Sequence, residues 1–371
     1  MLHPVPNHPI LFTGGGTLGP VTPLLAVAEA WRRREGDVAF AWIGTHHGPE
    51  RLLVERAKIP FTALAAPKLD RTRPWTLPFA PLFFGISLIK SIMLLRAMQP
   101  RAVISAGAYV SVPLAWAAWG MRIPVYIHQL DVEPGMANRL MAWCAKRITV
   151  TWPQSASVFP AKKTLVVGAM TRAVMRLGEA SLAKDRYGFP PSKPLILVIG
   201  GGTGAASMNE SIRTLVPELV KHASVIHLTG RGKMPANLPN HEHYIALEFL
   251  DEGLADVYAG ADIVIARAGM GTIAELAALG KASILLPIPQ SHQVANAHAV
   301  SEKEAAEVLI APTPQVLLQA IMKLLKDQDR RAYLSGNIRG LWPLNADERI
   351  VHEVVNDIGA VAADESSANI S

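Results

Sequence analysis

The chain has 371 residues, of which half are hydrophobic and 18% are charged, and its formal net charge is +6 at pH 7. This composition excludes an intrinsically disordered protein, and the length exceeds what one hydrophobic core usually organises, so we expect two domains. The basic balance indicates attraction to polyanions such as nucleic acid, phosphate-bearing substrates or an anionic membrane leaflet, and charge alone does not choose among them.

The cysteine and motif content narrows the class of protein further. A single cysteine, Cys144, excludes an internal disulfide and favours a reducing compartment such as the cytosol. No pair of histidines and acids has metal-ligand spacing, so we expect no metal and no cofactor. The first residues run straight into a strand and a glycine loop, without the pattern of a signal peptide. No interleaving of aromatic and basic residues is present, so nucleic acid is not expected as a partner.

Short apolar runs alternate along the chain with longer segments of helical pattern. Continuous apolar runs are typical of parallel strands that are covered on both faces, so the sequence predicts a doubly wound α/β fold. The expected strands are Ile10–Thr13, Val38–Ile43, Ala102–Ser105, Val125–His128, Leu195–Ile199, Val225–Leu228, Ile263–Ala266 and Ser283–Leu286.

Two of these strands run into glycine loops that open helices, at residues 14–19 and 200–204. Two such units half a chain apart indicate two Rossmann-like domains in tandem. We expect the first domain to comprise residues 1–168 and the second residues 169–345. Residues 346–371 would then hold a closing helix, at roughly Ala346–Ile358, and a flexible tail from about Ala360.

The first loop satisfies the pattern G-x-G-x-x-G through Gly14, Gly16 and Gly19, which can present backbone N–H groups and a helix N-terminus to a pyrophosphate. An NAD site is disfavoured, because the next strand runs into Gly44 without the acid that would hold the ribose. The alternative is that these glycines only allow a tight strand-to-helix turn.

The most informative stretch runs from Ile263 to Asn296. The helix expected after Gly269 carries Glu275 in its first turns, where a carboxylate is electrostatically favoured and can reach two ribose hydroxyls. The alternative is a carboxylate that only complements the helix dipole. Farther along, Gln293 and Asn296 share one helical face if a helix starts there, close to where the carboxyl ends of the strands meet a cleft.

Between Pro67 and Arg101 the chain is apolar and aromatic, with interspersed cations. A spanning helix needs about 20 uninterrupted apolar residues, and the prolines before residue 82 and the charge of Lys90 make spanning unfavourable. An apolar patch ringed by cations suits docking on an anionic membrane surface. The alternative is that Leu82–Leu95 is a core helix of the first domain.

Motifs in both halves resemble the MurG family of inverting, metal-independent GT-B glycosyltransferases, over nearly the whole chain from Thr13 to about Val354. The donor-site signature is the most specific of these motifs. The matching segments are the first glycine loop, Ser105–Ser111, the second glycine loop with Asn209, His227 with Thr229 and Gly230, Arg267–Glu275, and Gln293 with Asn296.

The resemblance implies transfer of N-acetylglucosamine from UDP-GlcNAc to lipid I at the cytoplasmic face of the bacterial cell membrane, as a peripheral enzyme. The ribose would lie on Glu275, the uracil near Phe249 and Leu250, and the acceptor pyrophosphate at the first glycine loop. The closing helix would return to the first domain. The substrate-binding residues that the resemblance implies are Thr17, Leu18, Gly19, Asp131, Arg172, Gly202, Thr203, Leu250, Met270, Gly271, Thr272, Ile273, Ala274, Glu275, Gln293 and Asn296.

The chain departs from the family pattern at the acceptor side. Pro20 stands where family members carry a histidine, and proline has no proton-transfer group, while Leu18 replaces a glycine. His128 and Asp131 are our hypotheses for the proton acceptor, and the alternative for His128 is a buried histidine satisfied by the backbone. Two other functions therefore stay open: a related transferase with a different lipid-linked acceptor, and a UDP-sugar-binding membrane scaffold with impaired catalysis.

Overall fold

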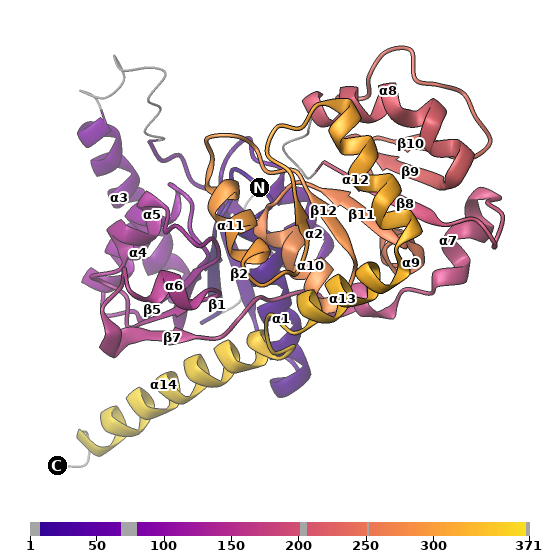
Figure 1. The fold of residues 1–371 in the computed structure, drawn as a ribbon. Helices are drawn as coiled ribbons and strands as arrows, with labels where there is room; N and C mark the ends of the chain where they lie inside the picture. The colour runs from indigo at the N-terminus through magenta and orange to yellow at the C-terminus, as the bar shows by residue number, and fades with distance from the viewer. Residues whose placement is uncertain (1–7, 68–79, 201–205, 251, 369–371) are drawn as a thin grey trace. The chain divides into compact units, whose positions relative to one another are not determined.

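The computed structural model describes residues 8–67, 80–200, 206–250 and 252–368. The chain divides into two compact units, one made of residues 1–170 with 344–371 and the other of residues 171–343. Each unit is built on one parallel sheet with helices against it (Figure 1). The predicted α/β class is therefore confirmed.

The first unit contains a seven-stranded parallel sheet of order β3-β2-β1-β4-β5-β6-β7. Every pair of neighbouring strands in it is parallel, and Ile10 of β1 lies between Phe40 of β2 and Ala102 of β4. The strands are β1 (Ile10–Thr13), β2 (Phe40–Gly44), β3 (Phe61–Ala63), β4 (Ala102–Ser105), β5 (Val125–Gln129), β6 (Arg147–Val150) and β7 (Thr164–Val166).

Alternate residues of these strands fill two separate layers of core. Leu11 and Val103 belong to a cluster shared with α3, α4 and α5, whereas Phe12 and Trp42 point to the opposite face and make an aromatic contact with each other. This alternation is what a sheet covered on both faces requires. The helices of the unit are α1 (Val21–Glu35), α2 (Glu50–Arg56), α3 (Ala80–Met98), α4 (Ser111–Gly120), α5 (Met136–Met141), α6 (Pro153–Ala156), the short 3-10 helix η2 (Ala161–Lys163) and α14 (Ala346–Ala368).

The second unit contains a six-stranded parallel sheet of order β10-β9-β8-β11-β12-β13. Its core gathers strand residues such as Ile196, Val225 and Ile263 with apolar residues of α8 and α12. The strands are β8 (Leu195–Ile199), β9 (Ser224–Leu228), β10 (Tyr244–Leu247), β11 (Ile263–Ala266), β12 (Ser283–Leu285) and β13 (Glu307–Val308). The helices are η3 (Ala173–Leu177), α7 (Ala180–Tyr187), α8 (Ala206–His222), α9 (Leu254–Gly260), α10 (Met270–Leu279), α11 (His292–Ser301), α12 (Pro314–Lys326) and α13 (Gln328–Arg339).

Both sheets have the same strand order within their own unit. Counted from the first strand of each unit, the order begins 3-2-1-4-5-6, and it reverses between β1 and β4 and between β8 and β11. In doubly wound folds, ligands bind outside the carboxyl ends of the strands at this reversal. The first glycine loop follows β1, and Gly269 follows β11, so both lie at such a position.

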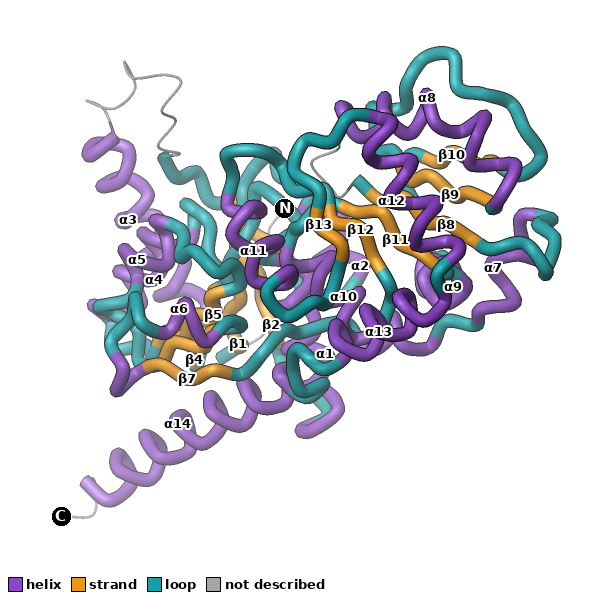
Figure 2. The backbone as a smooth tube through the Cα atoms, in the orientation of Figure 1, coloured by secondary structure: helices purple, strands orange, loops and turns teal. Residues whose placement is uncertain are grey.

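The closing helix α14 belongs to the first unit, where it packs against α1. Arg33 of α1 pairs with Asp347 at 3.1 Å, and Arg147 of β6 pairs with Asp357 at 2.9 Å and Glu353 at 3.1 Å. Figure 2 shows α14 as one continuous helix that runs to Ala368. The helix therefore runs ten residues past the expected end at Ile358, and four of those ten residues are alanine, which has the highest helix propensity.

Helix α3 passes the length and composition test for a membrane span, with a mean hydropathy of 1.5, and only 22% of it is buried. It buries Ser87, Ser91, Leu95 and Met98. The hydroxyl of Ser87 donates to the carbonyl of Ala65, and that of Ser91 donates to the carbonyl of Ser87. Of its other large apolar side chains, four are partly buried and five are exposed. The exposed apolar face of α3 consists of Leu82, Phe83, Ile86, Ile89 and Met93.

Candidate functional site

Glu275 lies in the second turn of α10 in the second unit, and two other polar side chains control its carboxylate. Its Oε2 accepts a hydrogen bond of 2.9 Å from the hydroxyl of Tyr258, a fully buried residue of α9. Burial raises the pKa of Glu275, while the Tyr258 hydrogen bond and the positive charge of Arg172 lower it. The structure thus brings together Glu275 and Arg172, which the sequence analysis named separately.

The N-terminus of α10 lies beside the other predicted donor residues. Gly269 begins the helix with no side-chain cap, and the first turn carries no acidic residue, so its N–H groups suit an anion. The side chains of Met270, Ile273 and Ala274 are buried, and the N–H of Ile273 bonds to the carbonyl of Gly269 as the first bond of the helix.

Helix α11 supplies Gln293 and Asn296 on one face, as predicted for a helix starting there. Ser291 caps the helix by accepting the N–H of Gln293, whose Oε1 accepts the N–H of Ile288 at 3.2 Å. Asn296 is fully buried and donates to the carbonyl of Ala268 at 3.3 Å. Both side chains therefore fix the loops that surround the start of α10.

Arg267 closes β11 and joins two neighbouring elements. Its guanidinium donates to the carbonyl of Leu286, after β12, and to the hydroxyl of Ser207 in the first turn of α8, both at 2.9 Å. Its Nε is buried with no partner among the described residues, and burial lowers the pKa of the group. These bonds fix the positive charge of the Arg267 guanidinium at the carboxyl edge of the second sheet.

Other predicted donor residues lie elsewhere or fall outside the description. Leu250 and Phe249 follow β10, where Arg231 lies over the Phe249 ring at 4.5 Å. Among the described residues, no hydrogen bond or ring contact joins this pair to Glu275. Gly202 and Thr203 lie outside the described residues.

In the first unit, the glycine loop leaves three consecutive backbone donors. Within the described chain, the N–H groups of Thr17, Leu18 and Gly19 have no hydrogen-bond partner. Pro20 has no N–H, and the N–H groups of the next two residues bond to the carbonyl of Leu18. The loop, rather than the start of α1, therefore offers donors to an anion.

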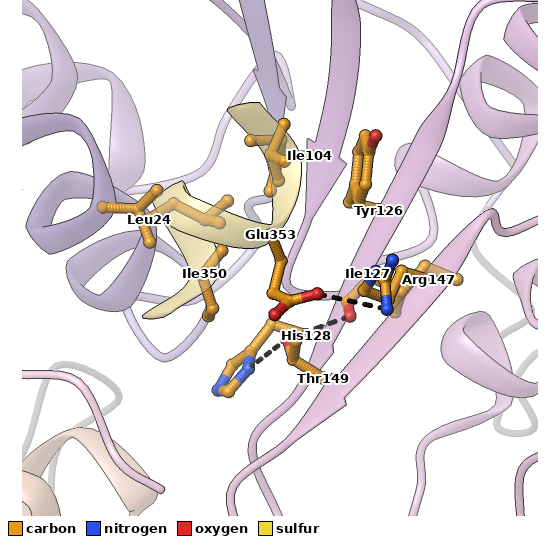
Figure 3. A pocket seen from close by; sticks show the side chains of 11 residues that line it. Leu24, Ile104, Tyr126, Ile127, His128, Arg147, Thr149, Ile350 and Glu353 are labelled. Carbon is orange, nitrogen blue, oxygen red and sulfur yellow. Dashed lines mark hydrogen bonds and ion pairs between the residues drawn. The ribbon is translucent and has the colours of Figure 1, made fainter. Parts of the chain in front are cut away.

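His128 lies at the end of β5 and is fully buried. Its Nδ1 contacts the hydroxyl of Thr149 at 2.9 Å and its Nε2 that of Thr151 at 3.2 Å, and burial lowers its pKa to about 3. The cavity beside it, shown in Figure 3, has a volume of about 10 Å³, which is room for one water at most. This geometry favours the structural interpretation of His128, with threonine hydroxyls rather than backbone as its partners.

Asp131 follows β5 and is partly exposed, so it stays a hypothesis for the proton acceptor. Its carbonyl accepts from the side chains of Gln129 at 2.8 Å and Ser155 at 3.1 Å. Asn138 in turn donates to Gln129 at 2.6 Å, and these bonds fix the loop that carries Asp131.

Two polar residues with evident roles in the structure escaped the sequence analysis. Tyr258 lies in an apolar helix and has the pattern of a core residue, so no signal distinguishes it. Glu50, which bonds to the first glycine loop, directly follows a Gly-Pro pair at a helix start, where a carboxylate usually indicates dipole complementation. Among the described residues, no group of three His, Cys, Asp or Glu side chains could hold a metal ion.

Family models match both halves of the chain. The glycosyltransferase family 28 N-terminal domain matches residues 10–150, and the family 28 C-terminal domain matches residues 195–338. Together these matches cover more than half of the chain, and each falls within one of the two units.

Curated relatives match over most of their length. One from Lachnospira eligens, a UDP-N-acetylglucosamine–N-acetylmuramyl-(pentapeptide) pyrophosphoryl-undecaprenol N-acetylglucosamine transferase, is 35% identical over 325 residues, which are 86% of this chain and 91% of the relative. A relative of the same name from Legionella pneumophila is 34% identical over 352 residues, covering 92% of this chain and 95% of its own.

Solved structures agree with the fold. The crystal structure of MurG from Acinetobacter baumannii matches with a TM-score of 0.71 and 25% identity, over 95% of this chain and 100% of that one. The structure of MnaA from S. aureus with UDP matches with a TM-score of 0.68 at 14% identity, over 93% and 95% of the two chains, which supports the fold alone. Two parallel sheets and these neighbours confirm the predicted GT-B fold, and the chain belongs to glycosyltransferase family 28.

Proposed function

We propose that this chain transfers N-acetylglucosamine from UDP-GlcNAc to lipid I, with inversion at the anomeric carbon, and so forms lipid II in peptidoglycan synthesis. The observation that carries the proposal is the Glu275 cluster at the carboxyl edge of the second sheet, in a chain whose relatives bear that activity in their names. Residues 169–345 would bind the UDP-sugar, and residues 1–168 with the closing helix would serve the acceptor and the membrane.

For the donor, the carboxylate of Glu275 would accept hydrogen bonds from the ribose hydroxyls. The Oε1 atom is the one available for them, because Tyr258 occupies Oε2. The diphosphate would meet the N–H groups at the start of α10, with Arg172 as a nearby cation. These groups would also stabilise the charge that develops on the departing UDP.

For the acceptor, the N–H groups of Thr17, Leu18 and Gly19 would bind the pyrophosphate of lipid I. Its attacking hydroxyl must lose a proton as the new glycosidic bond forms. Pro20 cannot accept it, and both nitrogens of His128 are already hydrogen-bonded. Asp131 is therefore the proton acceptor that we carry forward.

The lipid-linked acceptor would be met at an anionic membrane surface. Helix α3 connects β3 and β4, two parallel strands of one sheet, and this place as a crossover helix supports a helix that lies on the bilayer rather than across it. Its exposed apolar face carries Lys90 among the apolar residues. Next to it, Trp116, Trp119 and Trp143 stack edge to face, with the last two about half exposed. Tryptophans and cations around apolar side chains suit the membrane interface.

The test is a turnover assay with radiolabelled UDP-GlcNAc and lipid I in detergent micelles. We expect label in lipid II with the wild-type chain and a KM for UDP-GlcNAc at least about tenfold higher in Glu275→Ala, which loses charge-assisted hydrogen bonds to the ribose. The exposed Glu302 at the end of α11 provides the control, because Glu302→Ala should leave both constants unchanged.

Each failure of this assay points to a different alternative. Binding of UDP-GlcNAc without transfer to lipid I, but with transfer to another polyprenyl-linked acceptor, would identify the related transferase. Binding with no transfer to any such acceptor would identify the scaffold. Unchanged kinetics in Glu275→Ala would overturn the donor site proposed here.

A further inference from the structure

A buried carboxylate lies directly beneath the first glycine loop. Glu50 begins α2, and its side chain is fully buried. Its Oε2 accepts the N–H of Gly16 at 3.1 Å, and its Oε1 accepts the N–H of Thr45 at 2.7 Å and the Thr45 hydroxyl at 2.5 Å. In the described part of the chain these three hydrogen bonds, rather than an ion pair, satisfy the charge.

The backbone around this carboxylate is built for it. A Cβ added at Gly15 would lie 2.2 Å from Oε1 of Glu50, and one added at Gly48 would lie 1.8 Å from Oε2. Neither position can therefore carry a side chain while Glu50 keeps its place. A carboxylate is costly to bury, so a fold that leaves two glycines around it retains the charge for a reason other than core packing.

The hydrogen bond from Gly16 to Glu50 separates the N–H of Gly16 from the three N–H groups that follow it in the loop. Gly16 has a φ of +79°, and its N–H turns inward to Glu50, while the N–H groups of Thr17, Leu18 and Gly19 stay without partners among the described residues. Pro20 has no N–H, so the run of consecutive donors ends at Gly19, and the three N–H groups before it can bind an anion.

We propose that Glu50 is a positioning residue for the acceptor's pyrophosphate: by holding the N–H of Gly16, it fixes the loop so that the next three N–H groups face the phosphate oxygens. The carboxylate acts through the backbone and does not touch the substrate, whose negative charge it would repel. This inference rests on the proposed function, because it takes a pyrophosphate-bearing lipid as the ligand of the loop.

The first variant is Glu50→Gln, which keeps the size of the side chain and replaces one acceptor oxygen by an NH2 group. That group must face a backbone N–H, so one hydrogen bond is lost to a pairing of two donors. We expect the KM for lipid I to rise roughly tenfold, with kcat within about threefold and the KM for UDP-GlcNAc within about twofold of wild type. Glu55 is exposed on the same helix, and Glu55→Gln is the matched control.

The second variant is Gly48→Ala, which keeps the carboxylate charged but pushes it away from Gly16, because the new methyl group would overlap Oε2. The same rise in the KM for lipid I is expected, in a protein that unfolds at a lower temperature than wild type but is folded at the assay temperature and binds UDP as wild type does. Gly48→Ala leaves the sequence of the glycine loop and the charge of Glu50 unchanged. If it raises the KM for lipid I as Glu50→Gln does, the position of the carboxylate is what matters.

Calorimetric binding of farnesyl pyrophosphate separates this inference from the proposed function, since it needs no turnover. Weaker binding of farnesyl pyrophosphate by both variants than by wild type would support the role of Glu50. If the wild-type chain binds farnesyl pyrophosphate but transfers nothing to lipid I, the lipid I assignment is refuted while the role of Glu50 stands. The inference is overturned if folded variants keep the wild-type KM for lipid I and affinity for farnesyl pyrophosphate. It is equally overturned by a selective loss of kcat, which would put Glu50 in the chemistry itself.

Discussion

The candidate donor site depends on a pair of residues, of which only one is visible in the sequence. Glu275 is the group that would meet the ribose, but Tyr258 determines which of its oxygens is available and how easily it ionises. No apolar residue at position 258 can replace the tyrosine, because only a hydrogen-bond donor at that place can bond to the carboxylate of Glu275.

Removing the hydroxyl of Tyr258 should therefore weaken UDP binding and change its pH dependence. In Tyr258→Phe we expect the Kd for UDP to rise about fivefold at pH 7.5, the equivalent of one hydrogen bond. The hydrogen bond lowers the pKa of Glu275, so its loss raises that pKa, and the weakening of binding on acidification should begin at higher pH than in wild type. Calorimetric titrations between pH 5 and 8 measure both effects.

Tyr333 offers the control for this prediction, because it is an exposed tyrosine on α13 of the same unit. Tyr333→Phe should bind UDP as wild type does at every pH. If Tyr258→Phe weakens binding without moving the pH profile, its role is limited to packing.

The sequence analysis named candidate donor residues but not the residues that hold them in place, and the reason is physical. Glu275, Gln293 and Asn296 are polar residues in the helices that follow β11 and β12, at the carboxyl edge of the sheet, where ligands bind in doubly wound folds. Tyr258 and Glu50 are buried, and their roles depend on contacts with residues 17 and 34 positions away. A single sequence contains no record of such contacts.

Among the helices, α3 has features of both interpretations that the sequence left open, a core helix and an exposed apolar patch. It buries a narrow stripe against α4 and leaves five large apolar side chains exposed on another face. Exposed apolar patches of this kind mark interaction surfaces, and the tryptophans beside it extend the patch.

Charge introduced on this face should weaken attachment to a membrane. In the double variant Ile89→Glu with Met93→Glu, we expect sedimentation with vesicles rich in phosphatidylglycerol to fall at least about tenfold, because two apolar side chains are lost and two anions face an anionic surface. Leu182→Glu changes an exposed leucine of α7 in the second unit and should leave sedimentation unchanged. Equal binding of all three proteins would assign the face to another partner.

Four of the five strands that the sequence missed share a position in the fold, and the fifth, β6, is a mostly buried inner strand of the first sheet. Strands β3, β7, β10 and β13 lie at the edges of their sheets, and most of their residues are only partly buried. An edge strand needs no continuous apolar run, because one side and often one face meets solvent. The central strands β1, β4, β8 and β11 are fully or almost fully buried, and their predicted bounds agree with the structure.

At the scale of the whole molecule, each unit carries one buried histidine near the end of a strand among the residues that the structure describes. Burial lowers the pKa of His128 to about 3 and that of His227, in β9, to about 4. His227 is held by Tyr244 at 3.0 Å and Asn209 at 3.1 Å. Because burial disfavours the charged form of both histidines, the free energy of unfolding of each unit depends on pH through its own histidine.

The sign follows from the unfolded pKa of about 6.5. Each neutral histidine contributes stability that is complete above that pH and is lost as the pH falls toward 3 in the first unit and toward 4 in the second. The expected slope is up to about 1.4 kcal/mol per pH unit for each group. Compared with wild type, His128→Gln should flatten this slope for the first unit, and His227→Gln for the second.

Urea unfolding at pH 4.5 to 7.5 measures these slopes, and added UDP identifies the transition of the second unit by raising its midpoint. Each variant is the control for the other. A variant that flattens both transitions, or neither, would contradict the assignment of one histidine to each unit's acid sensitivity.

The first unit is interrupted in the chain by the whole of the second, because α14 returns to it after residue 343. During synthesis the ribosome therefore delivers the sheet of the first unit early and its last helix at the end. Until α14 arrives, the apolar side chains of α1 that it covers are exposed, while the second unit already has its full sequence. The unit that is made first is therefore completed last, and premature termination after residue 343 would leave a finished second unit attached to an unfinished first unit.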